Sequence, residues 1–260
     1  MDPLRATSAA RFLPISCEVA ADLGPGPIGH VASTGSTNTD LVREARTGDA
    51  SPAVLVADHQ TAGKGRLDRT WEDSSGAALL VSLRLPAALV DAAGAVRALG
   101  AAARAATDRL CVDPVLTKWP NDLVVVDGAR PGKLAGVLAE FVDGPEPCVV
   151  VGIGVNVRPA VGRPEATSLV ECGGADDRDA LLAELLRELA PRLRDGSAVL
   201  DELRAHSATI GSPVRADLPG GRVLLGDAVD LSADGALIVR TPDGVDHVVG
   251  TGDVIHLRPG

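Results

Sequence analysis

The chain has 260 residues, of which 45% are hydrophobic and 2% aromatic, and its formal net charge is -10. This length fits one large α/β domain, or a domain of about 200 residues and a small module, and the apolar content excludes a disordered protein. The acidic balance argues against an extended nucleic-acid-binding surface, because Lys and Arg make most phosphate contacts. We therefore expect no DNA partner.

The N-terminus lacks an apolar segment of signal-peptide length, and no apolar run is long enough to span a bilayer. We expect a cytoplasmic protein without a membrane partner. The cysteines form no Cys-x-x-Cys pair and have no His at zinc-ligand spacing. We therefore expect them to be reduced and to serve in packing, and we expect no metal site. They are Cys17, Cys111, Cys148 and Cys172.

For the first 206 residues, the sequence predicts an N-terminal arm followed by one sheet covered by helices. Residues 1–30 are rich in Ala, Pro and Gly and are too short for a helix-turn-helix domain. The Ala-rich stretch 90–110 predicts a helix, and Asp176 or Asp177 would begin another, with leucines on one face. Short apolar runs predict buried strands at 54–57, 78–85, 123–126, 134–141 and 148–157. Strands mixed with helices over 31–206 indicate an α/β fold with a sheet covered by helices.

The last residues differ in texture from the rest. After Ser207 there is no helical period, and the pairs at 234–235 and 243–244 are Asp-Gly, which favours hairpins because both residues tolerate positive φ. The segments 236–240 and 245–249 would be the strands around them. We therefore predict a small β-barrel module over 207–260.

Only three of the 25 basic residues are lysines, and each lies in a short motif. They are Lys64, Lys118 and Lys133. A chain that uses Arg nearly everywhere would keep Lys where a compact ammonium group is needed. Chance clustering is the alternative.

The densest motif begins at Gln60 and ends at Trp71. Glycines at 63 and 65 would let backbone N–H groups approach an anion, while Lys64, Arg66 and Arg69 add positive charge. The run lacks the spacing of a Walker A loop. A solvated mobile loop remains the alternative to a ligand-binding one.

The second motif, Lys118-Trp119-Pro120-Asn121-Asp122, lies between two predicted strands. Pro has a fixed φ and no N–H, so the segment should turn at a strand end and present polar groups where α/β proteins bind ligands. A tight turn capped by its own amide and carboxylate side chains is the alternative.

Three further sites carry polar side chains in apolar or capping positions. Lys133 begins an apolar strand and would project from it, or extend along the surface. Asn156 follows Gly152-Ile153-Gly154-Val155 and, if buried, must bond to the protein or to a ligand. Ser36-Thr37-Asn38 could simply cap a helix. His59 is interpreted as structural.

Together and in this order, these motifs resemble those of the biotin protein ligases, over about residues 31–260. The resemblance implies a mixed sheet related to class II aminoacyl-tRNA synthetases, followed by an SH3-like β-barrel. It implies that biotin and Mg-ATP give biotinyl-5'-adenylate, and that a lysine of a biotin carboxyl carrier domain then takes the biotinyl group. The short arm 1–30 indicates the monofunctional type, without an N-terminal DNA-binding domain.

The resemblance also implies residue roles. It implies biotin-binding roles for Ser36, Thr37, Asn38, Gln60, Lys64, Gly65, Arg66 and Lys133. It implies ATP or adenylate contacts for Gly63, Arg69, Trp71, Lys118, Asn121 and Asn156. The implied catalytic residues are Lys133, Arg66 and Asp122. Lys133 would neutralise charge near the biotin carboxylate and α-phosphate, and Asp122 would orient or deprotonate the incoming lysine.

Two departures and two rival functions accompany the resemblance. Lys64 stands where many members have Arg, and Asp68 where Gly is common, so the loop is expected to be stiffer and less basic. A lipoate or octanoate ligase is the rival enzyme, disfavoured because a saturated acyl chain would leave Ser36, Thr37 and Gln60 unpaired. A non-catalytic biotin-binding module is the other rival. Monomer and homodimer both stay open.

Overall fold

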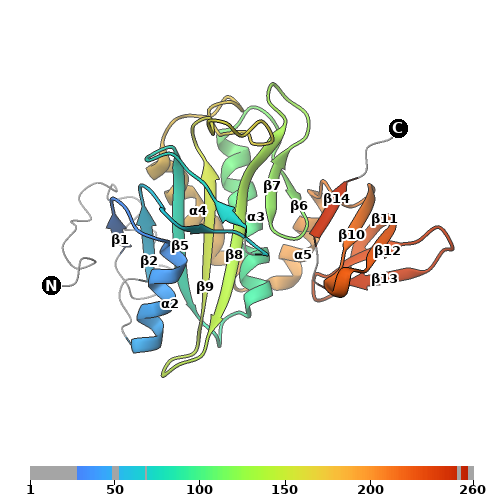
Figure 1. The fold of residues 1–260 in the computed structure, drawn as a ribbon, viewed down its shortest axis with the longest axis horizontal. Helices are drawn as coiled ribbons and strands as arrows, with labels where there is room; N and C mark the ends of the chain where they lie inside the picture. Colours follow the sequence, from blue (N-terminus) through green and yellow to red (C-terminus); the bar gives the residue numbers. More distant parts are fainter. Residues whose placement is uncertain (1–27, 49–52, 68, 251–252, 257–260) are drawn as a thin grey trace.

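The structure, a computed structural model, describes residues 28–48, 53–67, 69–250 and 253–256, and contains a seven-stranded and a five-stranded sheet (Figure 1). Most of the predicted N-terminal arm, with Cys17, lies outside the described residues, as does Asp68. The mixed sheet covered by helices and the C-terminal β module are both as predicted. The boundaries at 30 and 206 stay predictions.

The larger sheet has the strand order β1-β2-β5-β9-β8-β7-β6. Its strands are β1 (Ile28–Val31), β2 (Val54–Ala57), β5 (Ala78–Pro86), β6 (Leu116–Lys118), β7 (Asp122–Val125), β8 (Gly132–Val142) and β9 (Cys148–Asn156). β1 and β2 are parallel, whereas the other neighbours are antiparallel. All five predicted strands are present within a residue or two. The sequence did not reveal β1 and β6, which are short.

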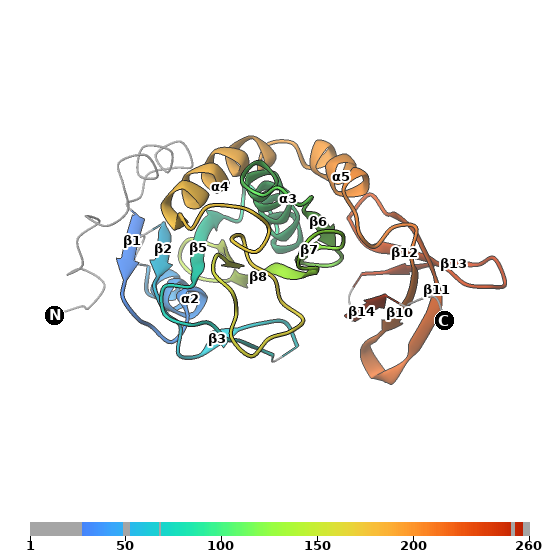
Figure 2. The ribbon, with the colours of Figure 1, turned by 90° about the horizontal axis from the view of Figure 1, so that it is seen from above.

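Helices cover both faces of this sheet (Figure 2). They are α2 (Thr37–Thr47), α3 (Ala92–Leu110) and α4 (Arg178–Arg192), whereas α5 (Gly196–Ala205) packs against α3, α4 and β11. α3 and α4 pack on one face and α2 on the other. Asp177 caps α4, because its carboxylate accepts hydrogen bonds from the backbone N–H groups of Asp179 and Ala180 at 3.1 and 3.0 Å. The predicted helix start is confirmed.

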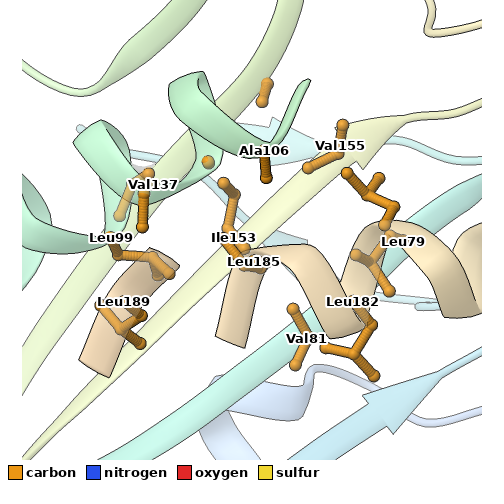
Figure 3. Close-up of a cluster of buried hydrophobic side chains, with 14 of the residues drawn as sticks. Leu79, Val81, Leu99, Ala106, Val137, Ile153, Val155, Leu182, Leu185 and Leu189 are labelled. Atoms are coloured by element: carbon orange, nitrogen blue, oxygen red, sulfur yellow. The ribbon is translucent and has the colours of Figure 1, made fainter. Parts of the chain in front are cut away.

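Strand residues alternate between two apolar cores. In β2, Val54 and Val56 join the large core beneath α3 and α4, whereas Leu55 and Ala57 join a smaller one against α2. Figure 3 shows the large core, where leucines of α4 such as Leu185 meet strand side chains. Because both faces of the sheet are covered, the sequences of its central strands are almost continuously apolar.

The five-stranded sheet has the order β13-β12-β11-β10-β14 and is antiparallel. Its strands are β10 (Pro213–Asp217), β11 (Val223–Leu231), β12 (Leu237–Arg240), β13 (Asp246–Val249) and β14 (Asp253–His256), with a short 3-10 helix, η4 (Pro219–Gly221). Gly235 and Gly244 have φ values of 81° and 85°, which glycine adopts without steric cost. Both Asp-Gly hairpins are therefore confirmed.

The described cysteines are packing residues, as predicted. Cys111, Cys148 and Cys172 form no disulfide. Burial raises the pKa of each thiol, and together with the neighbouring Cys172 it brings the pKa of Cys111 to about 12. These thiols stay protonated at neutral pH. Among the described helices, none is both long and apolar enough to cross a membrane.

Candidate functional site

Two adjoining cavities contain most of the polar residues that the motifs singled out. The first, of about 30 Å³, lies beside the N-terminus of α2. The second, of about 450 Å³, extends from it toward β14 of the C-terminal sheet. Residues that line both are Lys64, Trp71, Gly136 and Leu138. The site is therefore a small chamber that opens into a large one.

The small chamber is lined by an uncharged hydrogen-bond network. The side-chain oxygen Oε1 of Gln60 accepts hydrogen bonds from the backbone N–H and the hydroxyl of Thr37, at 2.8 and 3.0 Å. Ser82 lies 2.7 Å from that hydroxyl and donates to Oδ1 of Asn38 at 2.5 Å. Thr37, Asn38 and Ser82 are all buried. Such a network suits a neutral polar ligand that can pair with buried groups.

Ser36 occupies the N-cap position of α2 but makes no side-chain capping hydrogen bond. Its side chain is buried and lines the small chamber. Capping thus does not account for this serine. Ser82, which the motifs missed, carries one signal in the sequence, a hydroxyl inside the apolar run of β5.

Glycines on β9 shape the floor of the small chamber. Gly152 and Gly154 alternate with Val151, Ile153 and Val155, which point into the large core. A β-carbon on Gly154 would lie 2.5 Å from the ring of Trp71, and one on Gly152 would overlap the side-chain oxygen of Asn38. These glycines leave the α2-side face of β9 open for side chains from other segments.

The Gly63 to Trp71 motif forms a hairpin, in which β3 (Gly63–Lys64) pairs with β4 (Thr70–Trp71). The backbone N–H of Gly65 donates to the carbonyl of Arg69 at 2.6 Å. Gly63 lines neither cavity, but a β-carbon there would lie 2.5 Å from the carbonyl oxygen of Trp71. Gly63 therefore permits the close pairing of the two strands.

The large chamber carries mostly positive charge. Its basic residues are Lys64, Arg66, Arg69, Lys118, Lys133 and Arg163, and its acidic residues are Asp122 and Glu165. A concave site with this excess of cations attracts an anion of several charges, such as a polyphosphate. In a chain of net charge -10, this concentration is local.

Lys133 and Asp122 form an ion pair at the junction of the chambers. The Nζ atom of Lys133 lies 2.7 Å from Oδ1 of Asp122 and 5.8 Å from the ring centroid of Trp71. Both side chains are partly exposed. A β-carbon on Gly136 would lie 3.2 Å from the same Nζ atom, so the ammonium group lies over this glycine. One cation and one carboxylate therefore lie where the two chambers meet.

The turn between β6 and β7 carries Lys118, Asn121 and Asp122 into the large chamber, as its motif predicted. The Nδ2 group of Asn121 donates to the carbonyl of Val137 at 2.7 Å, and its Oδ1 atom accepts from Arg66 at 3.3 Å. Arg66 thus links the hairpin to the turn across the chamber.

Asn156 is buried, and its amide bonds to the protein. Its Nδ2 group donates to the carbonyls of Lys133 and Thr167, at 3.2 and 3.1 Å. It lines neither chamber, so a contact with adenine stays a prediction. Sequence reasoning missed Arg163 and Glu165, which lie on a loop without a recognisable motif. A backbone hydrogen bond and the guanidinium of Arg163 lower the pKa of Glu165.

His59 pairs with a carboxylate within the protein. Its Nδ1 atom lies 2.9 Å from Oδ2 of Asp73, whose other oxygen accepts from the backbone N–H of Gln60 at 3.3 Å. His59 lines neither chamber. Within the described residues, no group of three or more His, Cys, Asp or Glu side chains could hold a metal ion.

Comparison with known proteins agrees with this geometry. Residues 31–156 match the model of the Biotin/lipoate A/B protein ligase family, and residues 209–257 match the Biotin protein ligase C terminal domain. The chain is 43% identical to the biotin--[acetyl-CoA-carboxylase] ligase of Mycobacterium tuberculosis, over 88% of each chain. It is 31% identical to the bifunctional ligase/repressor BirA of Escherichia coli, over 88% of this chain and 73% of that one.

A solved structure shows the same architecture. The biotin protein ligase of Aquifex aeolicus in complex with biotin and ATP superimposes with a TM-score of 0.73 at 26% identity, covering 89% of this chain and 99% of the other. The match extends over both sheets, because it covers 89% of this chain. From the motifs, the paired chambers and these relatives, we conclude that the chain belongs to the biotin protein ligase family.

Proposed function

We propose that this protein activates biotin with ATP as biotinyl-5'-adenylate and then transfers the biotinyl group to a lysine of a biotin carboxyl carrier domain. The observation that supports this most is the junction of a chamber lined mainly by uncharged polar groups with a cationic one. The first suits the ureido ring of biotin, and the second suits the phosphates of ATP. Their shared boundary would bring the biotin carboxylate to the α-phosphate.

The small chamber would select biotin by hydrogen bonding. Ser36, Thr37, Asn38 and Gln60 surround it with groups that need partners when buried. The ureido ring can both donate and accept, so it can bond to the donors and acceptors that these groups keep beyond their bonds to one another, whereas the acyl chain of octanoate can make no such bond. Rejection of a ligand that lacks the matching polar groups is the strongest form of selection that such a site provides.

In the adenylation step, the biotin carboxylate attacks the α-phosphorus of ATP and pyrophosphate leaves. Negative charge accumulates on the phosphate oxygens in the transition state. Lys133 lies at the junction and would stabilise this charge, with Arg66 and Arg69 of the hairpin placed to hold the phosphates. Lys118 and Asn121 would contact the nucleotide from the opposite wall. A fixed cation at such a place contributes about 3 kcal/mol to a barrier.

In the transfer step, the carrier lysine attacks the carbonyl carbon of the mixed anhydride and AMP leaves. The amine must lose a proton, and Asp122 is the carboxylate beside the junction. Asp122 would orient or deprotonate the incoming amine once Lys133 turns from it toward the phosphate. Trp71 and the hairpin would keep water from the anhydride.

Mg²⁺ would enter with ATP. The large chamber has two carboxylates, Asp122 and Glu165, which is typical of sites where Mg²⁺ is held mainly by phosphate oxygens and water. It would neutralise phosphate charge there.

Pyrophosphate release tests the proposal. The purified protein is given ATP and Mg²⁺ with biotin, lipoate or octanoate, in the absence of any carrier protein. We expect release with biotin alone. Release only with lipoate or octanoate would instead assign the chain to the sister ligases, and tight biotin binding without release would favour a non-catalytic binding module.

A further inference from the structure

The turn that carries Lys118, Asn121 and Asp122 is attached to the C-terminal module through Trp119. The backbone N–H of Trp119 donates to the hydroxyl of Thr209 at 3.0 Å, and its indole N–H donates to the carbonyl of Gly235 at 3.1 Å. The indole also packs against the apolar core of the C-terminal sheet. Two hydrogen bonds of Trp119, one from its backbone and one from its side chain, therefore attach this turn to the C-terminal module.

Thr209 is fully buried, and its hydroxyl has a second partner, Nε2 of His256, at 3.1 Å. Burial, together with the positive charge of Lys118, lowers the pKa of His256 below its ordinary value of 6.5. The imidazole is therefore neutral at pH 7, and its Nε2 atom can accept a hydrogen bond. The hydroxyl of Thr209 can thus accept from Trp119 while it donates to His256, which only a hydroxyl at this position can do.

His256 ends β14, and the preceding residues Val254 and Ile255 line the large chamber. Thr209 therefore joins two walls of that chamber, the β6–β7 turn and β14. The network of the small chamber has no such link, because its hydrogen bonds connect Thr37 and Asn38 of α2 with Gln60, Ser82 and Leu138 of the larger domain. The two chambers thus differ in their dependence on the C-terminal module.

We propose that Thr209 is a positioning residue for the nucleotide half of the reaction. Through Trp119 it fixes the turn that presents Lys118, Asn121 and Asp122, and through His256 it fixes β14 against the same chamber. The C-terminal module thereby sets the geometry at which ATP is bound, without supplying a group that touches biotin. This inference rests on the function proposed above.

The test compares two variants at the same position. Thr209→Val keeps the shape of the side chain but removes the hydroxyl, so the N–H of Trp119 and the Nε2 atom of His256 lose their partner. Thr209→Ser keeps the hydroxyl. Biotin-dependent pyrophosphate release is measured for the full chain while ATP and biotin are varied separately. For Thr209→Val, we expect kcat/KM for ATP to fall about tenfold with the KM for biotin unchanged. Thr209→Ser should stay close to the unmodified protein.

Thr107→Val is the matched control. Thr107 is also fully buried, and its hydroxyl donates to the carbonyl of Ala103 within α3 at 2.7 Å, away from both chambers. Melting temperatures are measured for all three variants. Thr107→Val should retain full activity, whatever its loss of stability. If it lost ATP efficiency as Thr209→Val does, the effect would be one of general stability and the proposal would be wrong.

Other outcomes are equally decisive. Unchanged ATP kinetics in Thr209→Val, or an equal loss toward ATP and biotin, would overturn the positioning role. If Thr209→Val does not fold, Trp119→Phe removes the other hydrogen bond of Trp119, from the indole to Gly235, and the same selective loss toward ATP is expected. An unmodified protein that releases no pyrophosphate with biotin would contradict the proposed function itself, which separates the two failures.

Discussion

The two chambers of this protein are built from different parts of the chain and by different chemistry. The small one is enclosed by α2 and the central strands, and buried hydroxyl and amide groups bond to one another around it. The large one lies between the β3–β4 hairpin, the β6–β7 turn and β14, and it is lined by six basic side chains. Their volumes are about 30 and 450 Å³.

This difference indicates two modes of recognition. The small chamber is narrow and opens into the large one past Trp71, which lines both. Fixed, uncharged groups then demand a ligand with matching donors and acceptors. In the large chamber, long cationic side chains provide attraction through charge, which tolerates small changes of geometry. We therefore expect substitutions in the small chamber to change which acid is bound, and substitutions in the large chamber to change the rate of pyrophosphate release.

The largest effect is expected from Lys133→Ala. Loss of the ammonium group at the junction should lower biotin-dependent pyrophosphate release about a hundredfold, or ~3 kcal/mol. Circular dichroism should show an intact fold, because Lys133 is partly exposed. Near-normal release by a folded variant would remove Lys133 from the transition state and leave the large chamber without its central cation.

The next largest effect is expected from Glu202→Gln, which lies outside both chambers and should change stability without changing catalysis. Glu202 of α5 accepts hydrogen bonds from Arg192 at 2.9 Å and from Arg104 at 3.1 Å. Glu202→Gln should lower the free energy of unfolding by about 2 kcal/mol, because two guanidinium groups lose a partly buried anion. Kinetic constants for ATP and biotin should stay unchanged below the melting temperature. Urea unfolding checks the first expectation.

The pH dependence of this stability difference has a definite sign. Burial raises the pKa of Glu202, but the bonds to Arg192 and Arg104 outweigh burial, so the pKa lies below its ordinary value of 4.5. A carboxylate with a depressed pKa stabilises the fold fully above the unfolded pKa and loses this contribution as pH falls through the folded one. The unmodified protein and Glu202→Gln should therefore converge below pH 4.5. A difference that persists at low pH would contradict the ionic origin.

Gly154→Ala tests the small chamber. The added methyl group would displace the Trp71 ring, which lies 2.5 Å from its position, and distort the junction. We expect the KM for biotin to rise about tenfold, by ~1.4 kcal/mol, with a smaller change for ATP. Gly100→Ala is the control, since a β-carbon there meets no atom within 4 Å. As a substitution inside α3, it should stabilise the helix slightly and leave kinetics intact. An equal rise of the KM for biotin and the KM for ATP in Gly154→Ala would contradict the assignment of biotin to the small chamber.

The smallest effect is expected from Lys64→Arg, at a residue that lines both chambers. Lys64 lies 3.9 Å from Glu140, and its ammonium group is half exposed. A guanidinium group can replace that charge and add a planar fork for phosphate. We expect less than about a threefold change in either KM, since exposed pairs contribute little. A large gain in ATP affinity would show that Lys64 limits the binding of the nucleotide.

The sequence by itself determined the elements and most of the chemistry. Apolar runs bounded by Gly and Asp fixed the central strands, Asp177 fixed the start of α4, and Asp-Gly pairs fixed two hairpins, because each signal acts within a few residues. The motifs at 36–38, 60–71 and 118–122, with Lys133, also supplied most of the polar lining of both chambers, since the chemical type of a side chain does not depend on the fold.

Only the tertiary structure decided which of these groups meet. Ser82, Arg163 and Glu165 join the site through the sheet register and a loop path that no local pattern encodes. Asn156 bonds backbone carbonyls beside the site instead of lining a chamber. The contact between Trp119 and Thr209 spans 90 residues of sequence. Such pairings depend on long-range packing, and this is why the arrangement of the two chambers could not be predicted from the sequence.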